Sequence, residues 1–122
     1  MSAAHDKLLA LEKEFWIAGE EFFRRNADKD CLVAFTEMAG VMSNADLAAT
    51  AKKPNRWKEL EIELKGIVEP TDGVVLLSYE ASAVRENGEP YKALVSTGYV
   101  KRDDGWKMMF HAQAPLERRS QG

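Results

Sequence analysis

The segment Gly88–Leu116, "GEPYKALVSTGYVKRDDGWKMMFHAQAPL", contains two runs of alternating residues separated by a short turn. The turn "DDG", Asp103–Gly105, supplies a glycine that can adopt the positive φ of a tight hairpin turn. On either side, Tyr91–Arg102 and Trp106–Ala114 have the period of two that is typical of strands. The segment therefore predicts a long antiparallel hairpin.

The second run of this hairpin has two different faces. Its core face is formed by Trp106, Met108, Phe110 and Ala112. The opposite face mixes polar and apolar residues, which is typical of a protein interface that also forms hydrogen bonds. We therefore predict a homodimer through the outer face of the sheet; pocket lining and plain surface are the alternatives. The predicted interface residues are Ser96, Met109, His111 and Gln113.

The residues before this hairpin continue the same pattern toward the N-terminus. From Trp57, apolar Leu60, Ile62 and Leu64 alternate with charged residues, and Val74–Arg85 forms a further run. The turns "TDG" and "ENG" each contain a glycine. Four long strands joined by tight turns predict an antiparallel meander, which should curl because long strands twist and bend at bulges.

Helices are predicted before the meander. Apolar residues recur every three or four positions over Asp6–Asn26, and Gly19 predicts a break that leaves one long helix and a short one. "CLVAF", Cys31–Phe35, predicts a short buried strand, and "TEMAG" after it predicts a turn. "SNADLAATAKK" predicts a helix that is capped by Ser43 and ended by Pro54 and Asn55. A helical layer in the hollow of a curled sheet is an α+β fold. The predicted core is Leu8, Leu11, Phe15, Phe22, Phe35, Leu60, Ile62, Leu77, Val95, Met108 and Phe110.

Composition limits the function classes. The chain of 122 residues predicts a single domain, 1–122, with 117–122 frayed. A net charge of −3 and dispersed basic pairs argue against nucleic-acid and anionic-membrane partners. The single cysteine, Cys31, excludes an intrachain disulfide and predicts a buried thiol in a reducing cytoplasm. No apolar run approaches the length of a membrane span.

The order of elements resembles the nuclear transport factor 2-like cone, the fold shared with ketosteroid isomerase. Within it, the chain is similar to a SnoaL-like family catalogued as a domain of unknown function. Four segments carry the resemblance: "LEKEFWIA", "CLVAF", "GVMSNADL" and above all Gly88–Leu116. The resemblance implies a cone with the pocket on the inner sheet face and a second subunit on the outer face. It does not imply one reaction, because this scaffold hosts isomerases, cyclases, dehydratases, hydrolases and binding modules.

Candidate catalytic residues are few. The resemblance to ketosteroid isomerases would imply an Asp base, with a Tyr and a protonated carboxylic acid as hydrogen-bond donors to the oxyanion. Here the first helix has Phe15 and Trp16 in that region and no tyrosine. Glu37 follows an apolar strand and is the candidate base. The alternative interpretation is that Glu37 is a solvated turn residue. Tyr79 is the candidate hydrogen-bond donor to an oxyanion. The alternative interpretation is that Tyr79 is a tyrosine of the core. His111 would pair with Glu80 if they share a face, which parity leaves open because one bulge exchanges the faces.

An apolar pocket is predicted at the open end of the cone. Besides Tyr79, its predicted lining is Trp16, Phe35, Met38, Met42, Trp57, Trp106 and Phe110. Aromatic residues and methionines favour a small hydrophobic organic molecule, in a cavity of roughly 300 Å³ or more. The alternatives are a filled accessory module and a proton-transfer enzyme (isomerase, dehydratase or cyclase-like) that uses Glu37 and Tyr79. No metal-ligand spacing or phosphate loop is present, so we expect no metal and no organic cofactor.

Overall fold

A computed structural model describes residues 3–51 and 57–116. Its elements are α1 (Ala3–Ile17), α2 (Glu20–Asn26), β1 (Ala27–Phe35), β2 (Met38–Ser43), α3 (Asn44–Ala49), β3 (Trp57–Thr71), β4 (Val74–Arg85), β5 (Pro90–Arg102) and β6 (Gly105–Pro115). The predicted helix end at Pro54 and Asn55 and the predicted frayed tail, 117–122, lie outside the described residues.

The described strands form one sheet of six, in the order β2-β1-β6-β5-β4-β3. β3 to β6 form the predicted antiparallel meander. Glycines with positive φ lie in its turns, at Gly73, Gly88 and Gly105, as predicted. β1 joins the meander by pairing in parallel with β6, and β2 pairs antiparallel with β1.

The prediction of four long strands and one short one was incomplete. The short strand at Cys31–Phe35 is the second half of the nine-residue β1, and the stretch predicted as a turn is only Thr36 and Glu37. Met38–Ser43 is a sixth strand, β2, which has no fully buried residue. An edge strand of this kind lacks the apolar alternation that reveals the others.

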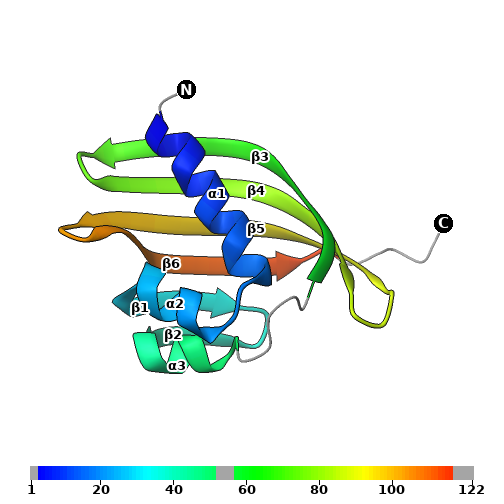
Figure 1. The fold of residues 1–122 in the computed structure, drawn as a ribbon. Coiled ribbons are helices and arrows are strands. Elements are labelled where there is room, and N and C mark those ends of the chain that lie inside the picture. Colours follow the sequence, from blue (N-terminus) through cyan, green and yellow to red (C-terminus); the bar gives the residue numbers. More distant parts are fainter. Residues whose placement is uncertain (1–2, 52–56, 117–122) are drawn as a thin grey trace.

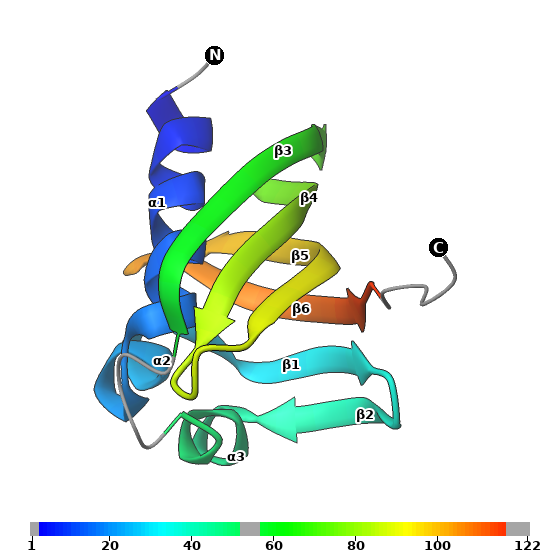
Figure 2. The same cartoon turned by 90° about the vertical axis from the view of Figure 1, so that its right-hand side faces the viewer.

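The helices pack on one face of this sheet, and the sheet bends around α1 (Figure 1 and Figure 2). The predicted break at Gly19 is confirmed, because α1 ends at Ile17 and α2 begins at Glu20. α3 is capped as predicted: the Ser43 hydroxyl accepts a hydrogen bond from the Asp46 N–H at 3.1 Å.

Most of the predicted core lies between α1 and the concave face. Leu8, Phe15, Leu77, Val95 and Met108 are buried, and the other predicted core residues, except two, are partly buried against them. The two exceptions are Phe35, which is 39% exposed, and Phe110. Phe110 pairs with Gly98 on the opposite face of the sheet from the core.

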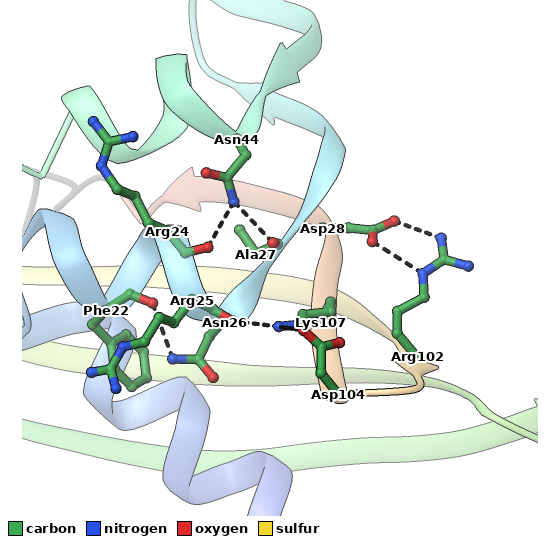
Figure 3. Close-up of polar contacts among 10 residues, drawn as sticks. All are labelled: Phe22, Arg24, Arg25, Asn26, Ala27, Asp28, Asn44, Arg102, Asp104 and Lys107. Carbon is green, nitrogen blue, oxygen red and sulfur yellow. Dashed lines mark hydrogen bonds and ion pairs between the residues drawn. The ribbon is translucent and has the colours of Figure 1, made fainter.

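Polar contacts hold α2 and α3 against the start of β1 (Figure 3). The Asn44 side-chain amide donates to the carbonyl groups of Arg24 (3.1 Å) and Ala27 (3.0 Å). Arg102 forms two hydrogen bonds to Asp28, at 3.0 and 2.7 Å, which lower the pKa of that carboxyl and tie β5 to β1. These contacts fix the end of the sheet that carries β1 and β2.

Asn44 offers a test of this junction. Because Asn44→Ala leaves two carbonyl groups without their amide donor, it should lower the free energy of unfolding by about 1–2 kcal/mol, measured by urea denaturation. The matched control, Asn87→Ala in an exposed turn, should change it by about 0.5 kcal/mol or less. Equal effects of the two substitutions would show that Asn44 does not hold the junction.

Candidate functional site

A cavity of about 170 Å³ lies between the helices and the concave face of the sheet. It is smaller than the predicted 300 Å³. Its wall is mainly aromatic and aliphatic, with polar groups from α1, from β6 and from the residue that follows α3. The lining residues are Glu12, Phe15, Trp16, Phe23, Phe35, Leu47, Thr50, Trp57, Met108, His111 and Gln113.

The wall formed by α1 contains a fully buried acid, Glu12, which is 0% exposed. Three hydroxyl groups donate to its carboxylate: Tyr79 (2.6 Å) and Thr97 (2.8 Å) to Oε2, and Tyr99 (2.5 Å) to Oε1. The indole N–H of Trp16 donates in turn to the Tyr79 hydroxyl at 2.9 Å. Burial of a carboxylate is tolerable only with such donors, so this network positions α1 on β4 and β5.

The buried hydroxyls next to Glu12 are held in their neutral form. Desolvation by burial, followed by the nearby Glu12 charge, raises the pKa of both Tyr79 and Tyr99 well above the usual range of a phenol. Desolvation likewise raises the pKa of Cys31 to about 12. Tyr79 is therefore a structural donor to Glu12, and its side chain does not line the cavity.

A second polar chain runs from Glu12 to the cavity through Thr97. The Thr97 hydroxyl oxygen lies 3.3 Å from His111 Nδ1, and His111 Nε2 lies 3.1 Å from Gln113 Oε1. The Gln113 amide donates to the Tyr91 hydroxyl at 2.7 Å. His111 is thus connected on one side to a buried carboxylate and on the other to an amide and a phenol.

A β-bulge places His111 and Gln113 in the cavity. Tyr99 pairs with Met108 but Gly98 pairs with Phe110, so Met109 is one extra residue in β6. Beyond it the two faces are exchanged: His111 and Gln113 point inward, and Phe110 and Ala112 point outward. The predicted placement of His111 and Gln113 on the outer face was therefore wrong, as was that of Phe110 and Ala112 on the core face.

The other predicted interface residues do lie on the outer face. Ser96 shares a hydrogen bond with Ser78 there, and the Met109 side chain reaches the outer surface of Gly98. Glu80 pairs with Leu94, in line with the exposed face of β5, so it does not share a face with His111. The predicted pair of Glu80 and His111 is not formed.

The structure brings together part of the predicted pocket. Trp16, Phe35 and Trp57 line the cavity, whereas Met42 and Trp106 pack against the core without lining it. Met38 is exposed on β2, and Phe110 points away because of the bulge. Glu37 is exposed in the β1–β2 turn, which is the alternative that the sequence left open.

Sequence reasoning missed Glu12 and Thr97 as site residues and misplaced His111 and Gln113. A signal for Glu12 was available: it lies four residues after Leu8 and four before Trp16, so it occupies the apolar stripe of α1. A single acid at a core position of an amphipathic helix is costly to bury and indicates a polar network. The bulge that turns His111 inward has no comparable signal.

Aromatic rings and a cation lie beside the cavity near Trp57. The Trp57 ring contacts those of Trp16 (5.4 Å) and Tyr91 (4.8 Å), and the Arg85 guanidinium lies over Trp57 and Tyr91 at 5.2 and 4.7 Å. Trp57 is half-buried and Phe35 is partly exposed, so the cavity reaches the surface beside these two residues.

The described residues, 3–51 and 57–116, contain no group of three or more His, Cys, Asp or Glu side chains that could hold a metal ion. Within the same ranges no helix combines the length and apolar character needed to cross a membrane.

Comparison with known proteins shows the fold. No family model and no curated protein matches the chain. A putative ketosteroid isomerase from Parabacteroides distasonis is 13% identical, with a TM-score of 0.74 over 90% of this chain and 86% of that one. A nuclear transport factor 2-like protein of unknown function from Prochlorococcus marinus is 16% identical, with a TM-score of 0.73 over 98% and 97%.

A third similar structure is a putative calcium/calmodulin-dependent protein kinase type II association domain from Thiobacillus denitrificans, which is 18% identical. Its TM-score is 0.68 over 88% of this chain and 94% of that one. At these identities the comparisons show a nuclear transport factor 2-like fold, as the sequence predicted, and they do not assign a reaction.

The buried phenols make stability depend on alkaline pH. Tyr79 and Tyr99 have raised pKa values in the folded protein, so above pH about 10 only the unfolded chain loses these protons. The free energy of unfolding therefore falls as the pH rises above about 10. Each such group adds a slope of about 1.4 kcal/mol per pH unit. Tyr99→Phe should reduce the slope by that amount in urea unfolding measured between neutral and alkaline pH. An unchanged slope would show that Tyr99 ionises normally.

Proposed function

We propose that the domain binds a small organic molecule of about six to ten non-hydrogen atoms, mostly apolar and with one hydrogen-bonding group. The observation that carries this proposal is the cavity, whose aromatic and aliphatic wall ends at the polar side chains of His111 and Gln113. A few convergent polar groups in an apolar hollow are typical of ligand sites.

The cavity volume limits the size of this molecule. A dry apolar cavity of about 150 Å³ can hold benzene, and the cavity here measures about 170 Å³. A single-ring compound therefore fits, whereas a four-ring steroid does not. Partly exposed Phe35 and half-buried Trp57 are the route of access.

The alternative, proton transfer by Glu37 and Tyr79, has no support in the geometry. Glu37 is exposed in a turn, and Tyr79 is buried against Glu12 and Trp16. These two side chains do not share the cavity. The narrower resemblance to the SnoaL-like family and a cytoplasmic location remain predictions.

We also propose that the domain is a homodimer through the outer face of the sheet. Directly paired residues, one from each strand, form a row across all six strands. This apolar row is Val41, Leu32, Phe110, Gly98, Leu76 and Val68. Four of its residues are large and exposed: Val41 (69%), Val68 (57%), Leu32 (51%) and Leu76 (37%). Such a stripe is typical of an interaction surface.

A second row of small residues runs beside the apolar row. This small row is Ala39, Ala34, Ala112, Ser96, Ser78 and Gly66. A ridge of large side chains next to a groove of small ones is self-complementary about a twofold axis, because each ridge can enter the partner's groove. Six strands spaced about 4.8 Å apart span about 29 Å, and the six residues of β2 limit the shared length to about 20 Å, so the face measures about 600 Å², the lower end of the area per partner in specific interfaces.

The ligand proposal is tested by binding of single-ring compounds. Benzene, phenol and cyclohexanone should raise the melting temperature and give saturable heats in titration calorimetry, whereas a steroid should not. Leu47→Phe adds bulk to the cavity wall and should weaken binding about tenfold or more. Leu11→Phe, in the same helical layer but outside the cavity, is the control. Absence of binding by all three compounds would contradict the proposal.

The dimer is tested by a matched pair of substitutions. Leu32→Lys places a charge in the apolar row and should shift the protein to a monomer in sedimentation velocity at micromolar concentration. Leu116→Lys makes the same change at a leucine of similar exposure, 41% against 51%, outside both rows, and should leave the dimer intact. A monomeric wild-type protein would contradict the proposal directly.

A further inference from the structure

We propose that His111 accepts a proton from the bound molecule, and that this molecule carries a weakly acidic hydroxyl, as a phenol or an enol does. This inference rests on the proposed ligand site and names the chemical class of its ligand. The groups that carry it are Glu12, Thr97, His111, Gln113 and Tyr91.

The hydroxyl proton of Thr97 determines the tautomer of His111. Thr97 has one hydroxyl proton, which it donates to Glu12 Oε2. Its oxygen is then an acceptor toward His111 Nδ1, so the ring proton of a neutral His111 lies on Nδ1. Nε2, on the other side of the ring, carries the lone pair, and His111 lines the cavity. Glu12 thus orients the imidazole as a proton acceptor through Thr97.

Gln113 can pair with both protonation states of His111. With its amide oxygen toward Nε2 and its amide nitrogen donating to Tyr91, it matches a protonated ring. With the amide turned over, its nitrogen donates to a neutral Nε2 and its oxygen accepts from the Tyr91 hydroxyl. Both arrangements use the same heavy-atom positions and direct Gln113 at Nε2, so the hydroxyl of the ligand takes the place of the Gln113 amide at Nε2 when it transfers its proton, and Gln113 keeps its contact with Tyr91.

The proton transfer is balanced in charge. The O–H bond of the ligand breaks, its electron pair stays on the ligand oxygen, and an N–H bond forms at His111 Nε2. The product is an anionic oxygen beside an imidazolium, with the Glu12 carboxylate behind it through Thr97. This order of acid, hydrogen-bonded ring and reacting hydroxyl stabilises the imidazolium, as a carboxylate does in a catalytic triad.

The surroundings of His111 favour a short-range transfer. Phe35 on β1 contacts the ring, at 5.8 Å between centroids, while Thr97 on β5 and Gln113 on β6 contact its nitrogens. The titratable groups behind these contacts are Glu12 on α1 and Tyr91 on β5. An apolar environment strengthens the attraction between the ligand anion and the imidazolium.

The experiment uses 4-nitrophenol, whose anion absorbs visible light and whose neutral form does not. Bound to the wild-type protein, it should ionise at a pH at least about one unit below that of the free probe, because a cation lies within contact distance. Nitrobenzene, which has no acidic proton, is the comparison ligand. His111→Gln should bind 4-nitrophenol without the shift.

The role of Thr97 as a positioning residue has its own readout. Thr97→Val removes the hydroxyl between Glu12 and His111 and should abolish most of the shift, whereas Thr71→Val, at the exposed end of β3, should keep it. Nitrogen chemical shifts of His111 in a His5→Gln background should show the Nδ1–H tautomer. This measurement on a protein with Thr97 intact decides the point even if Thr97→Val does not fold.

The outcomes separate the two proposals. Absence of binding by both probes contradicts the ligand site itself. Binding of both probes, with 4-nitrophenol remaining neutral, overturns the proton transfer and leaves the ligand site standing. An Nε2–H tautomer in the neutral protein, or a Thr97→Val protein with an unchanged shift, overturns the role of Glu12 and Thr97.

Discussion

A single buried carboxylate, Glu12, determines how the helical layer sits on the sheet. Three hydroxyl groups from β4 and β5 meet its two oxygens at 2.5–2.8 Å. Breaking a buried charged network by removing one partner typically costs about 3–5 kcal/mol, so α1 cannot slide or rotate without a large loss. The cavity between α1 and the sheet is therefore held in one shape, and its aromatic wall is set by the positions of Phe15 and Trp16 on the same helix.

Much of the fold could be predicted, because it follows from local patterns. Turn glycines with positive φ, the break at Gly19 and the cap at Ser43 all lie within a few residues of the elements that they define. The parallel pairing of β1 with β6 joins residues more than 70 positions apart, such as Ala27 and Met108. Nothing in either strand alone specifies that partner, so a six-stranded sheet could not be predicted from the runs themselves.

The site was predicted only where packing alone decides it. Trp16, Phe35 and Trp57 line the cavity as large side chains at the open end of the fold. The predictions that Glu37 and Phe110 face the site were wrong for geometric reasons: Glu37 lies in a tight turn, and a bulge turns Phe110 to the other face of the sheet. The polar half of the site depends on hydrogen bonds between α1, β5 and β6, and sequence spacing does not encode such contacts. Similar folds at 13–18% identity carry different names, so the fold alone does not assign a reaction.

The bulge at Met109 means that one strand contributes to two surfaces with separate demands. Residues after it contribute alternately to the inner hollow, through His111 and Gln113, and to the outer stripe, through Phe110 and Ala112. If the bulge closed with Met109 retained, Met109 would pair with Gly98 and the two sets would exchange, placing a phenylalanine in the hollow and an imidazole on the stripe, whereas deletion of Met109 would leave both sets in place. Evolution can therefore vary the residues of either surface independently, but the register of β6 against β5 at this point sets both surfaces at once.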